Sequence, residues 1–200
     1  MRVKGKSNTI QIIGGEHRGR KLRFPDVKGL RPTADRVRET LFNWLQARVP
    51  GAVCLDLFAG SGAIGLEALS RGAGRLVFCE QSAAAAHNLQ ENIKLLGMQD
   101  RAEVQRMDAR RLLQRLPGQL FDIVFLDPPF AAGLLSEICQ QLEQSGRLAQ
   151  NAFIYLEQDS SHAWPDLPSN WQLYRETSAG QAACRLFTMG VDLPNDDGCQ

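Results

Sequence analysis

The sequence V-C-L-D-L-F-A-G-S-G-A-I-G, residues 53–65, sets the architecture of the chain. It begins with an apolar run, turns through a glycine-rich segment at 58–62, and continues with apolar residues at helical spacing from Ala63. A buried parallel strand ends in this manner. Glycines let a ligand approach the backbone because they carry no Cβ atom. The stretch therefore predicts a strand, a tight loop, and a helix whose first N–H groups are free for a ligand.

The glycine loop fits some ligand-binding patterns better than others. It lacks the lysine of a phosphate-binding loop, whereas Gly60, Gly62 and Gly65 have the G-x-G-x-x-G spacing of a dinucleotide site. Asp56 shifts the balance, because a carboxylate inside a buried strand must hold loop N–H groups or face a cationic ligand. The pattern D-x-F-A-G-S-G resembles the first motif of S-adenosylmethionine-dependent methyltransferases. A glycine turn that only serves packing is the alternative.

Composition indicates one globular domain with a sizeable core. Apolar residues make up 44% of the 200 residues and charged residues 22%. No apolar run approaches the roughly 20 residues that span a bilayer, and no secretory pattern follows the basic N-terminus. Five scattered cysteines without a C-x-x-C pair predict reduced thiols in a cytoplasmic protein. The three histidines show no metal-ligand spacing, so we expect no metal.

Charge is spread unevenly along the chain. Residues 1–38 contain eleven Lys or Arg and three acids, a net charge of +8, whereas the remainder carries a net charge of −7. Such asymmetry indicates an N-terminal end that faces a polyanion, with a merely solvated basic tail as the alternative.

The N-terminal part is predicted to form a basic hairpin. Residues 1–7 are interpreted as disordered, and residues 9–13 and 21–24 as short strands joined by a glycine-rich connection. Arg18, Arg20 and Lys21 lie at its tip beside His17. A flexible basic hairpin of this kind can follow a phosphate backbone, so these three cations are candidate RNA ligands.

A helix is expected between Thr33 and Pro50. Thr33 is a candidate N-cap, and apolar residues recur at helical spacing from Val37 onward. Arg36 and Arg38 are expected to point away from the face that packs on the main domain. Ordinary solvated charge is one interpretation of this pair, and RNA binding is the one that their nearness to the basic hairpin favours.

From Val53 the pattern alternates strand and helix, which is typical of a parallel sheet covered on both faces. Strands are expected at 53–57, 75–80, 102–107, 121–126, 153–157, 171–175 and 184–189. Helices are expected at 63–71, 82–96, 109–116 and 134–142. Ser82 is the expected N-cap of the second of these helices, and the tail from Asp192 is expected to be frayed.

Four features fall at the carboxyl ends of these strands, where doubly wound sheets bind ligands. They are the loop at 58–62, Glu80, Asp108 and the turn at 127–130. Glu80 follows Gly60 by 20 residues, an offset at which an acid accepts hydrogen bonds from ribose hydroxyls. Asp108 is either an acceptor for an adenine amino group or a helix N-cap, and the two roles are compatible.

The tetrapeptide Asp127-Pro128-Pro129-Phe130 is the most diagnostic motif. Two prolines remove two N–H donors and leave carbonyl groups that only accept. The Asp127 carboxylate and a proline carbonyl can hold both hydrogens of an exocyclic amino group, which favours the pyramidal geometry in which its lone pair attacks a methyl group. Asp127 can also take up the proton, and Phe130 offers a face on which a base stacks.

The tetrapeptide is similar to the [NDS]-P-P-[YFW] motif of amino methyltransferases. Together with G-G-x-x-R-G-R, R-P-T-x-D-x-x-R-E-x-L-F-N-W-L and D-L-F-A-G-S-G-x-x-G-L-E-A-L-S-R-G, it resembles the bacterial small-subunit ribosomal RNA methyltransferase D family over residues 8–190. The resemblance implies a Rossmann-like α/β fold of the class I methyltransferase type. It implies seven strands, the last of them antiparallel. It also implies S-adenosylmethionine as the donor and a guanine N2 of 16S rRNA, in a partly assembled small subunit, as the acceptor.

The expected site divides into three groups of residues. Donor binding is assigned to Asp56, Phe58, Gly60, Ser61, Gly62, Glu80 and Asp108, catalysis to Asp127, Pro128 and Phe130, and RNA binding to Arg18, Arg20, Lys21, Arg36 and Arg38. Residues 180–186 match the family only loosely, so no site residue is assigned there.

Residues 1–50 are predicted as the RNA-facing extension of a monomer, 51–191 as the methyltransferase domain and 192–200 as a polar tail. Rival functions are an amino methyltransferase acting on adenine N6 or cytosine N4 of DNA, or on a protein glutamine. A non-catalytic RNA-binding or assembly protein and a dinucleotide oxidoreductase are the remaining alternatives.

Overall fold

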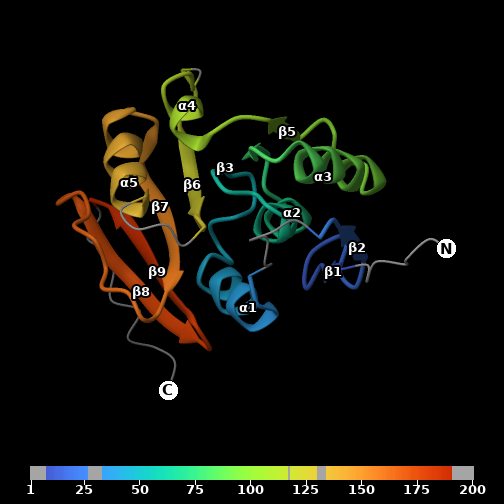
Figure 1. Ribbon diagram of the computed structural model, residues 1–200, viewed down its shortest axis with the longest axis horizontal. Coiled ribbons are helices and arrows are strands. Elements are labelled where there is room, and N and C mark those ends of the chain that lie inside the picture. Colours follow the sequence, from blue (N-terminus) through green and yellow to red (C-terminus); the bar gives the residue numbers. More distant parts are fainter. Residues whose placement is uncertain (1–7, 27–32, 117, 130–133, 191–200) are drawn as a thin grey trace.

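The computed structural model describes residues 8–26, 33–116, 118–129 and 134–190. Within these residues the main element is a seven-stranded sheet with the order β5-β4-β3-β6-β7-β9-β8 (Figure 1). Its strands are β3 (Val53–Asp56), β4 (Arg75–Cys79), β5 (Ala102–Gln105), β6 (Phe121–Leu126), β7 (Leu148–Asp159), β8 (Trp171–Ala179) and β9 (Ala182–Met189). All neighbours pair in parallel except at β9, which runs antiparallel to both β7 and β8. The expected fold class, with its antiparallel last strand, is confirmed.

Alternating side chains of the strands supply two separate cores. Cys54, Phe78 and Phe125 point to one face of the sheet, where they pack with α1 (Asp35–Trp44), α2 (Ala63–Ser70) and α3 (Ala83–Leu95). Leu55 and Val124 point to the other face, toward α4 (Ala109–Leu113) and α5 (Leu134–Gln144). Because both faces are covered, β3 and β6 are apolar apart from Asp56 and Asp122, as the sequence pattern predicted.

The N-terminal hairpin forms its own two-stranded sheet beside α2 and α3 (Figure 1). Its strands are β1 (Asn8–Gln11) and β2 (Lys21–Phe24), paired antiparallel from Asn8 opposite Phe24 to Gln11 opposite Lys21. Ile10, Leu22 and Phe24 bury their side chains in the core shared with α1, α2 and α3. The hairpin is thus packed on the main domain rather than held by a linker.

Local signals in the sequence account for most element ends. The hydroxyl oxygen of Ser82 accepts a hydrogen bond from the backbone N–H of Ala85, which confirms it as the N-cap of α3. Gly97 follows α3 with a φ of 68°, in the left-handed region that glycine tolerates. The predicted strand at 153–157 is too short, because β7 runs from Leu148 to Asp159 and its pairing with β6 shifts register between Phe121 and Ile123.

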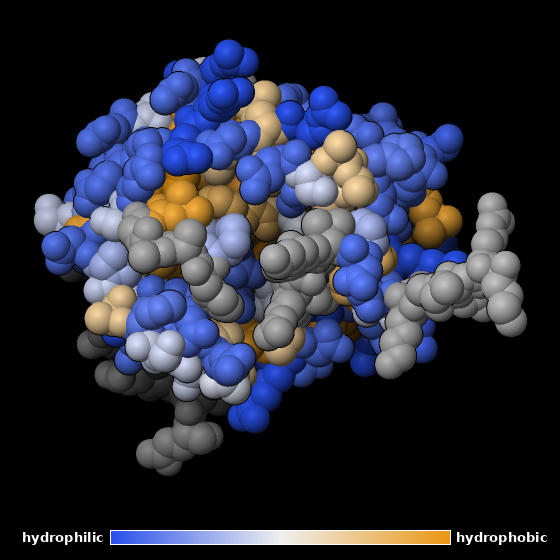
Figure 2. All heavy atoms as spheres, in the orientation of Figure 1, coloured by the Kyte–Doolittle hydropathy of each residue, from blue (hydrophilic) through white to orange (hydrophobic). Residues whose placement is uncertain are grey.

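The surface and the cysteines agree with a globular domain. The face shown in Figure 2 is largely hydrophilic, and hydrophobic residues are visible mainly in a hollow near its centre. Cys54, Cys79, Cys139 and Cys184 are buried free thiols, as expected, while Cys199 lies outside the described residues. Within the described ranges, none of the helices combines the length and the apolar content that crossing a bilayer requires.

Candidate active site

A cavity of about 870 Å³ opens at the carboxyl ends of the central parallel strands. Its wall brings together the four strand-end features predicted from the sequence. Of the predicted donor and catalytic residues it includes Asp56, Phe58, Gly60, Ser61, Glu80, Asp108, Asp127 and Pro128. Phe130 lies outside the described residues. This volume is within the usual range of about 300–1,000 Å³ for small-molecule sites.

The glycine loop between β3 and α2 has the backbone that its sequence predicts. Gly60 and Gly62 have φ values of 52° and 79°, which side chains with a Cβ rarely adopt. Gly62 is the N-cap of α2 and supplies no side-chain cap, and a Cβ there would collide with Leu89. Because Gly62 does not line the cavity, its contribution is the turn, whereas Gly60 and Ser61 form the wall.

Asp56 and Glu80 shape this loop from two neighbouring strands. Asp56 is buried, and its carboxylate accepts a long hydrogen bond of 3.4 Å from the N–H of Phe58. Burial raises the pKa of Asp56 to about 7. Glu80 accepts hydrogen bonds from the N–H groups of Gly60 (2.9 Å) and Ser82 (2.6 Å). The orientation of the Glu80 carboxylate is therefore fixed against the loop.

Asp108 has the helix N-cap role that was one of its two interpretations. One carboxylate oxygen accepts from the backbone N–H of Arg110 at 3.0 Å. The Arg110 guanidinium also donates to both oxygens, at 2.9 and 2.8 Å, and these hydrogen bonds lower the pKa of Asp108. The N-cap is confirmed, and the contact with an adenine amino group stays a prediction.

The Asp127-Pro128 motif directly follows β6 and faces the same cavity. The Thr33 hydroxyl donates a hydrogen bond of 3.3 Å to the Asp127 carboxylate. Burial, followed by the nearby charge of Glu157, raises the pKa of Asp127 well above its usual range, and the Thr33 hydrogen bond offsets part of that rise. A carboxyl with a raised pKa is a better proton acceptor.

Three contributions to the cavity were missed in the sequence. Thr33 was predicted as the N-cap of a helix, but the N-cap of α1 is Ala34, without a side-chain cap, and Thr33 instead contacts Asp127. Glu157 at the end of β7 also lines the cavity and accepts from the Tyr155 hydroxyl at 2.8 Å. Its position after a predicted strand, like that of Glu80, was an available signal. The β8–β9 turn adds Ala179, Gln181 and Ala182.

The basic residues assigned to RNA do not behave alike. Arg18, Arg20, Lys21 and Arg36 are exposed. The assignment of Arg38 is wrong, because its side chain is fully buried and its guanidinium is bound to Asp35 and to the main chain of Gln11. The helical pattern could not show this, because Arg38 neighbours the apolar face of α1 and, apart from Asp35 on the same helix, finds its polar partners in other segments.

Five carboxylates line the cavity and, among the described residues, one cation, Arg110, which pairs with one of them. In the part of the chain that the structure describes, the charges that raise the pKa of Asp56 and Asp127 are the carboxylates of Glu80 and Glu157 and, for Asp127, that of Asp56. Carboxylates that share a poorly solvated site favour a cationic ligand, which relieves their mutual repulsion. Among the same residues no group of three or more His, Cys, Asp or Glu is placed to hold a metal ion.

The sheet order, the glycine loop and the strand-end acids together define a Rossmann-like domain of the class I methyltransferase type. A family model described as "Conserved hypothetical protein 95" matches residues 10–188. The ribosomal RNA small subunit methyltransferase D of Escherichia coli strain K12 is 50% identical over 181 residues, which cover 90% of each chain. The protein of the same name from Haemophilus influenzae is 41% identical over 180 residues, covering 89% of this chain and 93% of that one. The chain belongs to the ribosomal RNA small subunit methyltransferase D family.

Solved structures agree with this placement. The structure of the E. coli protein yhhF is 46% identical and superimposes with a TM-score of 0.83, covering 91% of this chain and 98% of that one. The Thermus thermophilus protein TTHA0928 is 30% identical, with a TM-score of 0.74 over 88% of this chain and 98% of that one.

Proposed function

We propose that this protein transfers a methyl group from S-adenosylmethionine to the exocyclic N2 of a guanine in 16S rRNA of the small ribosomal subunit. One observation carries the proposal: the Asp127-Pro128 motif and the glycine loop with Glu80 line the same cavity. An acceptor amino group and a donor molecule bound by these two features would meet inside it. The names of the relatives support rRNA as the substrate. Guanine as the base follows from the family resemblance alone.

The residues of the cavity suit this donor. S-adenosylmethionine supplies a methyl group made electrophilic by a positively charged sulfur. Glu80 stands at the end of β4, where its fixed carboxylate can accept from the ribose hydroxyls. Asp108 is the candidate acceptor for the adenine amino group. Asp56 belongs to the acidic set that favours a cation, and its hydrogen bond from Phe58 is long, at 3.4 Å.

The acceptor would be held by the Asp127 carboxylate and the Pro128 carbonyl. Proline has no N–H, so this backbone segment presents acceptors to the two hydrogens of an amino group. Holding both hydrogens directs the nitrogen lone pair toward the methyl group, and positioning of this kind supplies much of the rate of group transfer. When the N–C bond forms, the nitrogen must lose a proton, and Asp127, with its raised pKa, is placed to accept it. Phe130 is proposed to stack on the base.

The N-terminal extension, residues 1–50, is proposed to bind the RNA. Arg18, Arg20, Lys21 and Arg36 present exposed cations for phosphates. The target guanine must be unpaired or flipped to reach Asp127. We propose a monomer that acts in the cytoplasm on a partly assembled small subunit.

The proposal is tested by methyl transfer from labelled S-adenosylmethionine to three substrates. These are small subunits from cells that lack this gene, naked 16S rRNA, and duplex DNA, followed by nucleoside analysis. N2-methylguanosine on the subunit, absent with the Asp127→Asn variant, is the expected result. Methyladenine or methylcytosine in DNA would contradict the proposed substrate, and failure to bind the donor would overturn the assignment of the glycine loop.

A further inference from the structure

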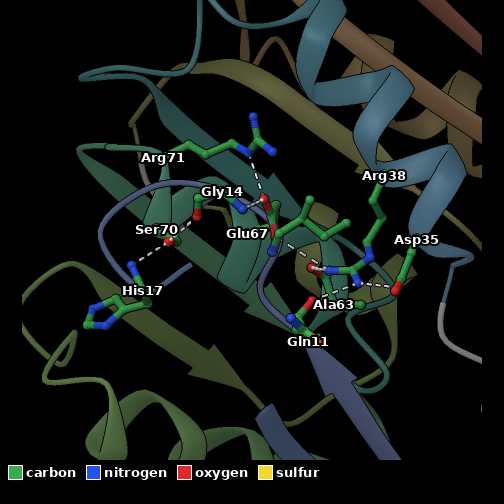
Figure 3. Close-up of polar contacts among 10 residues, drawn as sticks. Gln11, Gly14, His17, Asp35, Arg38, Ala63, Glu67, Ser70 and Arg71 are labelled. Carbon is green, nitrogen blue, oxygen red and sulfur yellow. Dashed lines mark hydrogen bonds and ion pairs between the residues drawn. The ribbon is translucent and has the colours of Figure 1, made fainter. Parts of the chain in front are cut away.

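A buried ion-pair network joins the N-terminal hairpin to the main domain (Figure 3). Glu67 on α2 and Arg38 on α1 both have fully buried side chains, and their charged groups lie 3.5 Å apart. Both residues belong to motifs of the sequence that the proposed reaction does not use. Their burial requires a structural reason, since an ion pair taken out of water is stable only when its remaining groups are satisfied.

Glu67 fixes the connection between β1 and β2. Its two carboxylate oxygens accept from the N–H groups of Ile13 and Gly14, each at 2.7 Å, and one also pairs with Arg71 at 2.7 Å. Ser70, one turn later on α2, accepts from the N–H of His17 and donates to the carbonyl of Gly14 (Figure 3). The hairpin connection, predicted to be flexible, is instead tied to α2 over residues 13–17.

Arg38 reaches in two directions from the other end of the network. Its Nη2 atom donates to the carbonyl of Gln11 on β1 (2.9 Å) and to the carboxylate of Asp35 at the start of α1 (2.6 Å). Its Nη1 atom donates to the carbonyl of Ala63, in the first turn of α2 (3.3 Å). The Arg38 guanidinium therefore sets the distances between the hairpin, the start of α1 and the start of α2.

A groove of about 350 Å³ lies between the two segments that Arg38 joins. One wall is the hairpin and the other is the chain that enters α1. The groove is lined by Thr9, Ile10, Gln11, Lys21, Thr33, Ala34 and Asp35. Thr33 and Ala34 also line the large cavity, so the groove and the cavity share this wall next to Asp127. A polymer whose target unit enters the cavity would pass its neighbouring unit along this groove.

The lining of the groove matches a nucleotide better than a run of phosphates. Among its described lining residues are one cation, Lys21, and one carboxylate, Asp35, which would repel a phosphate on its own side. The hydroxyl group of Thr9 and the amide of Gln11 can donate to and accept from a base edge or a ribose 2′-hydroxyl. The Thr33 hydroxyl, which already donates to Asp127, can accept a hydrogen bond there. Its volume lies at the lower end of the range for small-molecule sites.

We propose that this groove is the subsite for the RNA nucleotide adjacent to the methylated base, and that Arg38 is a positioning residue that sets its width. The inference rests on the proposed function, because it takes an RNA strand as the substrate. The groove adds a contact with a second base or sugar to the proposed active site. An RNA strand can use this contact, and a free nucleoside cannot. The groove also gives the buried Arg38–Glu67 pair a function in substrate binding.

Filling the groove is the first test. Thr9→Trp places a large side chain at an exposed hairpin position in the groove, and Gln172→Trp, at an exposed position on β8, is the matched control. We expect Thr9→Trp to raise the KM for small subunits by about tenfold, the loss expected when contact with one base is removed. The Kd for S-adenosylmethionine should not change. An unchanged KM in Thr9→Trp, while the wild-type protein methylates subunits, would overturn the subsite and leave the proposed function standing.

A cross-link identifies the occupant. Gln11→Cys carries a photoreactive thiol reagent into the groove, and the wild-type protein treated in the same way gives the background. Irradiation with small subunits should mark nucleotides directly next to the methylated guanine. Cross-links only to distant rRNA or to a ribosomal protein would overturn the assignment.

Arg38→Lys tests the positioning role. Lysine keeps the charge but cannot donate to Gln11, Asp35 and Ala63 from one planar group. We expect a higher KM for subunits with kcat and the Kd for S-adenosylmethionine unchanged. Parallel losses in KM, kcat and donor binding would show that Arg38 serves only the stability of the fold.

Discussion

Glu67 and Asp56 are two buried carboxylates on consecutive elements, and their surroundings are opposite. Glu67 accepts from two backbone N–H groups and pairs with Arg71 and Arg38. Asp56 has a 3.4 Å hydrogen bond from Phe58 and a neighbouring carboxylate, Glu80, that raises its pKa further. The Glu67 carboxylate has its hydrogen-bond and ion-pair partners within the protein. Ionising Asp56 costs free energy, because its carboxylate is buried beside that of Glu80.

This contrast separates structure from function on physical grounds. A buried charge with full partners stabilises the arrangement of segments that supply those partners. A buried charge next to like charges is tolerated where a ligand of opposite charge completes the site. We therefore expect changes on the Glu67 side to affect stability and, through Arg38 and the groove, the KM for subunits. Changes on the Asp56 and Asp127 side should affect donor binding and catalysis.

Asp127→Asn should give the largest effect. The amide keeps the shape of the side chain but cannot take up a proton, so kcat should fall by about 10²–10⁴-fold. The urea midpoint should stay the same or rise, because a poorly solvated acid is replaced by a neutral group. Steady-state kinetics and urea unfolding measure the two effects, with the exposed Asp100→Asn as the control. Near-normal turnover would remove Asp127 from the mechanism.

Glu67→Gln should have the opposite profile. Removing one partner of a buried ion pair leaves Arg38 without full compensation and should cost about 3–5 kcal/mol of unfolding free energy. Glu103→Gln, which breaks the exposed Arg75–Glu103 pair, should cost no more than about 1 kcal/mol. Urea unfolding followed by circular dichroism compares the two variants. Equal losses would mean that the Glu67 network contributes little.

The pH dependence of the unfolding free energy tests directly whether Asp56 carries an uncompensated buried charge. Because the pKa of Asp56 is raised to about 7, the folded protein keeps a proton there that the unfolded chain has already lost above about pH 4. Between about pH 4 and 7 this group therefore makes the ligand-free protein less stable as pH rises. Relative to Asp56→Asn, the wild-type protein should lose stability over that interval.

Donor affinity should change in the opposite direction. The ionised Asp56 attracts a cation, so the Kd for S-adenosylmethionine should fall by about tenfold between pH 6 and pH 8. Isothermal titration calorimetry at both pH values measures this, and Asp56→Asn should flatten the dependence. A wild-type Kd that is independent of pH would mean that Asp56 does not face the charged part of the donor.

Arg18→Ala should produce the smallest effect. It should separate RNA binding by the hairpin from donor binding in the cavity. Loss of one phosphate contact should weaken RNA binding a few-fold and reduce the salt slope by about one, without changing donor binding. Filter binding at several salt concentrations measures this, with Lys94→Ala on α3 as an exposed control. If Arg18→Ala and Lys94→Ala have equal effects, the hairpin has no special part in RNA binding.

The local sequence was enough to predict the strands and helix ends that depend on neighbouring residues. The largely apolar segments at 53–56 and 121–126 became β3 and β6, because a strand buried on both faces needs apolar residues on both of its sides. Ser82 could be identified as an N-cap because the cap bonds to a backbone group three residues away. The strand-end positions of Asp56, Glu80, Asp108 and Asp127 followed in turn, since parallel strands end at the same edge of a sheet.

Only the tertiary structure determined the partners of Thr33, Arg38 and Glu157. Thr33 and Asp127 are 94 positions apart in the chain, and Glu67 lies 53 and 54 positions from the N–H groups that it accepts from. A polar side chain beside the apolar face of a helix is buried when segments distant in the sequence supply hydrogen-bond partners for it. Without such partners it stays exposed to solvent. Composition and spacing therefore predicted the sheet, the loop and the cavity edge. Arginine is an exposed RNA candidate at Arg36 and a buried connector at Arg38, because only the tertiary fold brings Gln11, Ala63 and Glu67 to Arg38.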